Sequence, residues 1–295
     1  YTLGLIGKNV FKIAVIFVIL CDLLLFKSPQ MHFSTNEEVL PKERTADFLT
    51  NQPGIFRVIP LQDIRDLSTP MKDKTFLHPA SNHFYGLSSP EGFQSLLLKR
   101  YVDLMYLFDK GTHNELTGKI AQFQDFNQHI ANLINIKYLV TSKDRVLKSP
   151  FRLAYIDHEY RVYKNTEVFP RAFAVHKRLV LNKDEDILNA IRDNDVPLDK
   201  VVILEEGPGD RLNLPSSNNT YNSMARIEEY EPHSVVVNVD MKADGYLVLT
   251  DCYFPGWRVY VDGIREKIHR ADYIFRAVEL KKGEHKLHFV YKPFS

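Results

Sequence analysis

The segment from Gly245 to Ser295 constrains the fold of this chain most strongly, because turn signals divide it at short, regular intervals. The turns fall at Phe254-Pro255-Gly256, Asp262-Gly263 and Lys282-Gly283. Between them, in runs of about six residues, aliphatic or aromatic side chains alternate with polar ones. This pattern is typical of antiparallel strands joined by tight turns, so the segment predicts a β-meander.

The same alternation starts earlier and predicts a wholly β-stranded carboxy-terminal part. The predicted strands cover residues 223–230, 234–241, 246–251, 257–261, 264–269, 274–280 and 286–291. In the strand at 257–261, period-two alternation places Trp257, Val259 and Val261 on one face and Arg258 on the other. So many short antiparallel strands in one stretch predict a sandwich of jelly-roll or immunoglobulin-like type.

The residues before this β-stranded part have a mixed pattern. Helical spacing or capping signals predict helices at 37–48, 90–108, 123–134 and 183–193, and short apolar runs predict strands at 55–60, 136–141, 160–164, 172–176 and 201–204. Residues 205–222 are rich in turn formers and have no periodicity, which predicts a linker. The expected fold class is α+β, divided into a transmembrane helix with its flank (1–28), a mixed α/β domain (29–204), the linker (205–222) and a β-sandwich domain (223–295).

An apolar run near the amino terminus indicates contact with a lipid bilayer. Residues 13–26 read IAVIFVILCDLLLF and are interrupted only by Asp22. A transmembrane helix, a signal-peptide core and a buried globular helix all remain open, but the transmembrane helix is favoured because no small-residue cleavage site follows the run. Lys8 and Lys12 favour a cytoplasmic amino-terminal end. We therefore expect the residues after about 28 to lie outside the cytoplasm.

Composition and motifs exclude several classes of function. The formal net charge is +1, which gives no reason to expect a nucleic-acid partner. The two cysteines, Cys21 and Cys252, have no metal-ligand spacing, and the sequence contains no P-loop or dinucleotide fingerprint, so neither a metal nor a cofactor is expected. Glu205 and Glu206 are adjacent, and adjacent side chains on a strand point apart, which argues against a catalytic carboxylate pair. We predict no catalytic residue in this chain.

The best candidate for a binding site lies at the start of the meander. Trp257 and Tyr253 could stack on the C–H faces of a sugar ring, while Asp251 and Arg258 could hold its hydroxyl groups. The competing interpretation is that Trp257 is a core residue of the sandwich. Its replacement by alanine separates the two, because only a core residue would make the loss of stability large.

Several segments together resemble one family. Residues 246–263 (YLVLTDCYFPGWRVYVDG) and 269–293 (HRADYIFRAVELKKGEHKLHFVYKP) resemble the external carboxy-terminal domain of the bacterial YfhO family. Residues 83–96, 132–141 and 163–175 are similar to earlier parts of the same domain. The resemblance implies a polytopic membrane protein of the GT-C glycosyltransferase type, whose catalytic carboxylate lies in an early external loop outside this chain.

The resemblance thus predicts a function in the bacterial cell envelope. We expect the chain to be the extracytoplasmic carboxy-terminal part of a cell-membrane glycosyltransferase that transfers sugar from a polyprenyl-phosphate donor to an envelope glycopolymer such as teichoic acid. This part would shape the site or bind the acceptor. The alternative is a non-enzymatic, membrane-tethered module for carbohydrate binding or adhesion.

Overall fold

The structure, a computed structural model, describes residues 7–27, 44–61, 82–90, 98–108, 126–206 and 221–293. Parts of the predicted helices at 37–48, 90–108 and 123–134, and most of the predicted linker, lie outside these residues. The chain forms two units, Tyr1–Lys42 and Glu43–Ser295.

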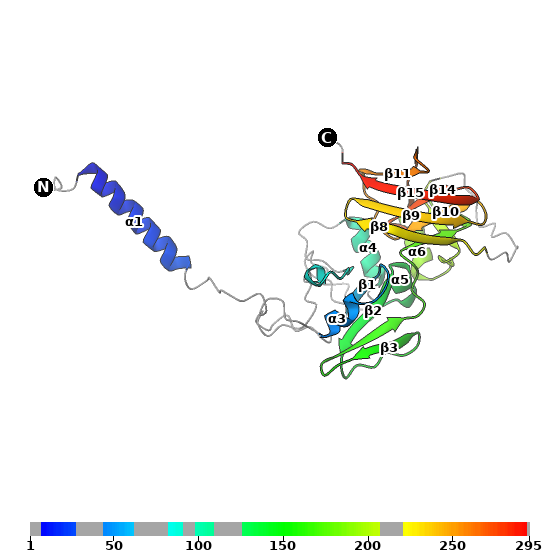
Figure 1. The fold of residues 1–295 in the computed structure, drawn as a ribbon, viewed down its shortest axis with the longest axis horizontal. Helices are drawn as coiled ribbons and strands as arrows, with labels where there is room; N and C mark the ends of the chain where they lie inside the picture. The colour runs from blue at the N-terminus through cyan, green and yellow to red at the C-terminus, as the bar shows by residue number, and fades with distance from the viewer. Residues whose placement is uncertain are drawn as a thin grey trace. The chain divides into compact units, whose positions relative to one another are not determined.

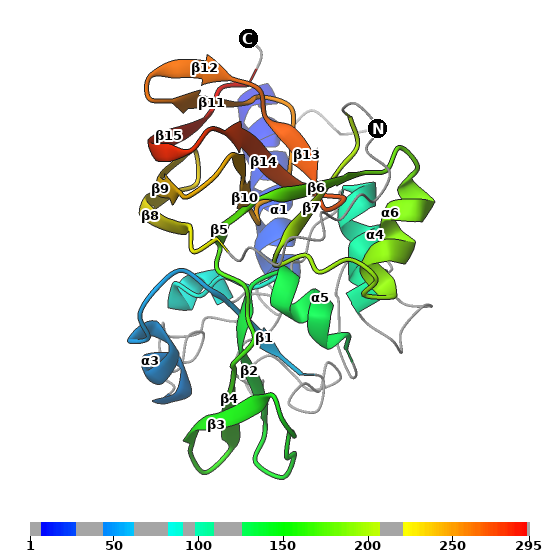
Figure 2. The same cartoon turned by 90° about the vertical axis from the view of Figure 1, so that its right-hand side faces the viewer.

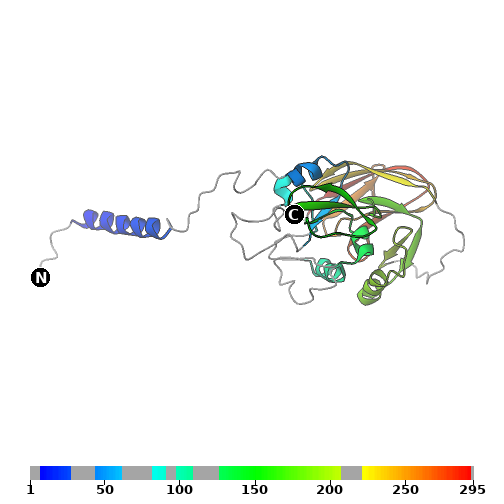
Figure 3. The same cartoon turned by 90° about the horizontal axis from the view of Figure 1, so that it is seen from below.

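Within the described part of the first unit, residues 7–27, the chain forms the helix α1 (Lys8–Lys27), the blue helix in Figures 1 and 3. Its apolar side chains are exposed, for example Val10 at 60%, Phe17 at 65% and Leu24 at 67%. Among the described residues, no helix has both the length and the apolar character needed to cross a membrane. The predicted helix is therefore present, but its transmembrane role is not confirmed.

The second unit is mixed α+β, as predicted, and mostly β in its carboxy-terminal part. Its described helices are α3 (Arg44–Thr50), the 3-10 helix η4 (Asn82–Tyr85), α4 (Lys99–Phe108), α5 (Gln128–Leu133) and α6 (Asp184–Arg192). A four-stranded sheet in the order β1-β2-β4-β3 is built from β1 (Arg57–Pro60), β2 (Ile136–Ser142), β3 (Phe151–Ile156) and β4 (Tyr160–Asn165). The β1–β2 pair is parallel and the other pairs are antiparallel.

A six-stranded sheet runs in the order β5-β10-β14-β13-β7-β6 (Figure 2). Its strands are β5 (Ala172–Val175), β6 (Lys177–Val180), β7 (Val201–Leu204), β10 (Gly245–Leu249), β13 (His269–Ala271) and β14 (Phe275–Leu280). The β6–β7 pair is parallel, because α6 returns the chain to the same end of the sheet. Both strands lie in the region 29–204, for which the sequence predicts a mixed α/β pattern.

A five-stranded antiparallel sheet has the order β12-β11-β15-β9-β8. It consists of β8 (Met224–Glu231), β9 (Ser234–Met241), β11 (Trp257–Val261), β12 (Ile264–Glu266) and β15 (Gly283–Tyr291). Val237, Val259 and Leu287 from this sheet and Leu247 from the six-stranded sheet are 0% exposed and share one hydrophobic core. The two sheets therefore form a sandwich, and each such side chain contributes about 1.5–3 kcal/mol to folding.

The division into domains at residues 205–222 remains a prediction, but the six-stranded sheet does not stop there. Strands β5, β6 and β7 precede this segment, and β10, β13 and β14 follow it. A second core, with contributions from α4, α5 and α6, joins the six-stranded sheet to the four-stranded one. Side chains from both sides of the predicted linker thus pack into common cores.

Candidate carbohydrate-binding pocket and a buried arginine cluster

A pocket of about 200 Å³ opens where the start of α4 approaches the loop between β10 and β11. Most of its lining is apolar or aromatic, with basic side chains added from α4 and β13. The lining residues are Leu98, Lys99, Arg100, Tyr101, Cys252, Tyr253, Phe254, Pro255, Arg270 and Ile274. Aromatic surface combined with N–H donors is the composition expected of a small-ligand site.

Tyr253 is the predicted site residue that the fold brings to this pocket. Its backbone N–H donates to the Ile274 carbonyl at 2.6 Å, which fixes the β10–β11 loop against the turn between β13 and β14. The guanidinium of Arg270 lies 4.7 Å from the centre of its ring, a cation–π contact. The ring is thereby held in place by backbone and side-chain contacts.

The basic wall of the pocket is held by acidic partners. Arg100 donates to Glu205 and, at 2.6 Å, to Asp184 Oδ1, while Arg270 Nη1 donates to Glu205 Oε2 at 3.0 Å. Glu206 instead pairs with Lys267 at 2.6 Å. The adjacent carboxylates Glu205 and Glu206 therefore have different partners, although both lie just beyond the end of β7 at Leu204.

Trp257 is placed in the sandwich and is not among the residues that line this pocket. It packs against the core between the two sheets, and the Arg276 guanidinium lies 3.8 Å from the centre of its ring. Tyr291 lies 5.5 Å away, measured between ring centres. Arg258, on the other face of β11, is half-buried. These contacts favour packing over ligand binding, and they place a cation over one face of the indole.

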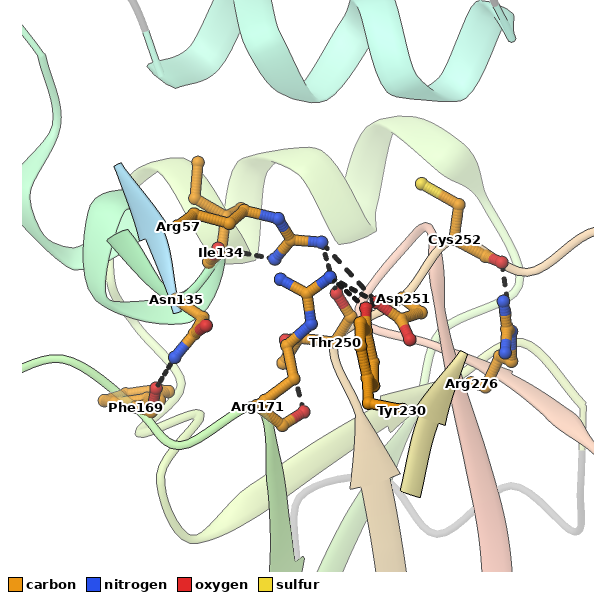
Figure 4. Close-up of polar contacts among 10 residues, drawn as sticks. All are labelled: Arg57, Ile134, Asn135, Phe169, Arg171, Tyr230, Thr250, Asp251, Cys252 and Arg276. Carbon is orange, nitrogen blue, oxygen red and sulfur yellow. Dashed lines mark hydrogen bonds and ion pairs between the residues drawn. The ribbon is translucent and has the colours of Figure 1, made fainter. Parts of the chain in front are cut away.

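Asp251 points into a buried group of charges that sequence reasoning did not find (Figure 4). Its Oδ1 lies 2.7 Å from Arg171 Nη2 and 3.6 Å from Arg57 Nη2, and it accepts the Tyr230 hydroxyl at 2.9 Å. Arg171 also donates to the Tyr230 oxygen. We call Arg57, Arg171, Tyr230, Asp251 and Arg276 the arginine cluster.

Backbone carbonyl groups hold the outer arginines of the cluster. Arg57 donates to the Ile134 carbonyl at 2.7 Å and to the Thr250 carbonyl at 2.9 Å. Arg276 Nε donates to the Cys252 carbonyl at 3.1 Å. Because Arg57 belongs to β1, Tyr230 to β8 and Arg276 to β14, the cluster lies where all three sheets meet.

Burial and neighbouring charges shift the protonation equilibria of the cluster. Burial alone would raise the pKa of Asp251, but Arg171, Arg57 and Arg276 outweigh it and hold this pKa below its usual value. Burial, aided by the positive charge of Arg171, lowers the pKa of Arg57 to about 10. Burial raises the pKa values of the Tyr230 hydroxyl and the Cys252 thiol. At neutral pH the cluster therefore holds three guanidinium cations, one carboxylate and a neutral phenol.

The four predicted site residues thus occupy three different environments. Asp251 and Tyr253 flank Cys252, yet one faces the arginine cluster and the other lines the pocket. Trp257 and Arg258 belong to β11. The sequence carries no signal for the cluster, because its members are far apart along the chain and each alone is an ordinary charged residue. Within the part of the chain that the structure describes, no group of His, Cys, Asp or Glu residues is arranged to hold a metal ion.

Comparison with known proteins identifies the class to which this carboxy-terminal region is related. The family model described as "Bacterial membrane protein YfhO" matches residues 210–294. The match confirms the resemblance to the YfhO family over this segment, which contains the five-stranded sheet and half of the six-stranded one. No curated protein and no solved structure matches the chain.

Proposed function

We propose that this chain is the extracytoplasmic carboxy-terminal part of a membrane glycosyltransferase that transfers sugar from a polyprenyl-phosphate donor to a cell-envelope polymer. The match of residues 210–294 to a bacterial membrane protein family supports the membrane context. The transfer reaction is the activity that the resemblance implies. In this assignment the chain contributes a binding surface for the acceptor, and the catalytic carboxylate belongs to another part of the protein.

The pocket beside Tyr253 is the observation that carries this assignment. Its loop residues, Cys252 to Pro255, with Arg270 and Ile274, belong to the family-matched segment. Tyr253 and Tyr101 provide aromatic surface on which the C–H face of a pyranose can stack, and Arg100 and Arg270 provide N–H donors for its hydroxyl groups. The arrangement suits recognition of one sugar unit of a larger polymer.

Sugar transfer in membranes that contain the full-length protein tests the assignment. Radiolabelled polyprenyl-phosphate sugar is supplied, and incorporation into envelope polymer is measured. Tyr253→Ala is expected to raise the KM for acceptor about tenfold, because it removes a stacking contact of roughly 1.4 kcal/mol. Tyr221→Ala, at an exposed tyrosine outside the pocket lining, is the matched control and should leave the KM unchanged.

The same experiment separates the two candidate functions. Membranes that bind the polymer in a Tyr253-dependent way but transfer no sugar would support the non-enzymatic carbohydrate-binding or adhesion module. Absence of both transfer and Tyr253-dependent binding would overturn both assignments.

We also propose that α1 attaches this chain to the bilayer and that the residues after about 28 face the outside. The exposed apolar side chains of α1 support this, since in water they would remain unburied. Double replacement with Val18→Asp and Leu24→Asp should weaken retention in the membrane fraction after carbonate extraction.

A membrane-impermeant amine reagent applied to intact cells should label exposed lysines such as Lys200. Labelling only after lysis would contradict the outward placement.

A further inference from the structure

The arginine cluster contains more positive than negative charge in a buried position. Among the described residues, Arg57, Arg171 and Arg276 are opposed by the single carboxylate of Asp251, an excess of two positive charges. Arg171 is 7% exposed and Arg276 is 4% exposed. A guanidinium withdrawn from water without a counter-charge is strongly destabilised, so this excess requires compensation.

The described neighbours supply only part of that compensation. Carbonyl groups accept from Arg57 and Arg276, and the rings of Tyr230 and Trp257 lie 5.3 Å and 3.8 Å from the guanidinium carbons of Arg171 and Arg276. These groups are dipoles or quadrupoles and carry no net charge. Asp251 is the ionised carboxylate that raises the pKa values of both Arg57 and Arg276.

The buried arginines also have donors that the described residues do not use. Nε and Nη1 of Arg171, and Nη1 of Arg276, are buried and have no hydrogen-bond partner among those residues. Buried N–H groups are almost always paired in folded proteins. A water molecule could accept from such a nitrogen, but it would leave the excess charge in place. An anion satisfies both requirements together.

The geometry points to a buried binding site for a small inorganic anion of chloride size, held by the unused Nε–H and Nη1–H groups of Arg171 in the arginine cluster (Figure 4). A small ion fits best because the surrounding side chains are nearly closed to solvent, with Arg57 and Asp251 each 13% exposed. The bound anion offsets part of the excess positive charge of the arginine cluster, so its role is to stabilise the folded chain. This inference is independent of the sugar-binding assignment.

Thermal unfolding of the full chain in different sodium salts tests the site. The melting temperature is measured in chloride and in gluconate, which is too large for a closed site, at matched ionic strength. Chloride should raise the melting temperature in a saturable way, by about 3–8 °C at a hundred times its dissociation constant. Equal melting temperatures in the two salts would overturn the inference.

Three variants assign the effect to the cluster. Arg171→Gln removes the unused donors of this arginine and one positive charge, so the chloride-dependent rise should be lost. Asp251→Asn removes the competing negative charge at nearly constant shape, so the rise should occur at lower chloride concentration. Arg265→Gln changes an exposed arginine of β12 and should respond to chloride as the unaltered protein does. A rise that persists in Arg171→Gln would place chloride elsewhere.

Crystals of the unaltered protein grown with bromide give a test that does not depend on whether a variant folds. An anomalous peak within hydrogen-bonding distance of Nε or Nη1 of Arg171 is expected. Ordered water at those nitrogens and no anomalous peak would show that hydration alone satisfies them, which would overturn the inference.

Discussion

At the residue scale, Asp272 is an ionisable residue whose side chain the fold buries completely. Its side chain is 0% exposed, Oδ1 accepts the Ile203 N–H at 2.8 Å, and Oδ2 has no hydrogen-bond partner among the described residues. Burial raises its pKa to about 7, against the opposing effect of the Ile203 N–H. Between about pH 4, where an unfolded aspartate titrates, and pH 7, the folded chain binds a proton that the unfolded chain does not. Stability therefore falls as pH rises through this window.

The variant Asp272→Asn tests this consequence. Asparagine cannot ionise, keeps an acceptor for the Ile203 N–H, and tolerates the left-handed backbone at this position, where φ is 45°. We expect the variant to be more stable than the unaltered protein by about 1–3 kcal/mol at pH 8, and to differ little at pH 4.5. Urea denaturation at both pH values measures the difference. Asp199→Asn, at an exposed aspartate, is the control and should change neither value.

Trp257 gives a second prediction at the residue scale, because packing and ligand binding make opposite demands on it. Its contacts with the sandwich core, Arg276 and Tyr291 favour packing. Trp257→Ala should lower the free energy of unfolding by about 3 kcal/mol, whereas Trp257→Phe should lose less than half of that. Both variants should retain glycan binding wherever they remain folded. Lost binding with unchanged stability would instead make Trp257 a sugar platform.

At the element scale, Gly245 shows why β10 can lie against β5. A Cβ atom at this position would approach the Val175 carbonyl oxygen to 2.2 Å, and a backbone atom in a paired strand cannot easily move away. Gly245→Ala should therefore disrupt the β5–β10 pairing and destabilise the protein by about 2–3 kcal/mol. Gly263→Ala is the comparison, since its added Cβ meets open space and only the positive φ of 86° is unfavourable. It should cost about 1 kcal/mol in thermal or urea unfolding.

The elements themselves follow closely from the sequence where local signals are strong. Strands β9, β11 and β7 match their predicted ranges, and the buried side chains of Val259 and Val261 confirm the predicted face of β11. Alternation and turn residues are local properties, so one sequence suffices to read them. Strands β3 and β6 were not predicted, because β3 is largely exposed and β6 follows β5 after a single residue.

Pairing between distant strands could not be predicted in the same way. Nothing in the pattern of Ala172–Val175 specifies β10 as its neighbour, although β5 pairs with β10 at Tyr246↔Val175 and three further positions. The arginine cluster is similarly invisible in the sequence, since Arg57, Arg171 and Arg276 meet only after three sheets have assembled. Tyr253 could be predicted as a site residue, because its aromatic side chain directly precedes the recognisable turn Phe254-Pro255-Gly256.

At the scale of the whole molecule, these long-range contacts bear on how residues 43–295 unfold. Strands β5 and β7, which precede the predicted linker, pair with β10 and β13, which follow it. Arg57 of the four-stranded sheet reaches Asp251 and the Thr250 carbonyl beside the six-stranded sheet. Separating the residues before the predicted linker from those after it would expose the shared hydrophobic cores and leave buried charges without partners. We therefore expect the two parts to unfold together.

Calorimetry and controlled cleavage test this cooperativity. Differential scanning calorimetry should give one unfolding transition for residues 43–295, with equal calorimetric and van't Hoff enthalpies. A protease site inserted between residues 206 and 221 should allow cleavage into two fragments that still migrate together in native gel filtration, because the six-stranded sheet takes strands from both. The fragment after the cut should not fold alone, since its β10 and β13 would present unpaired edges where β5 and β7 had been. Two resolved transitions, or fragments that separate in native buffer, would show that the predicted linker divides independent domains.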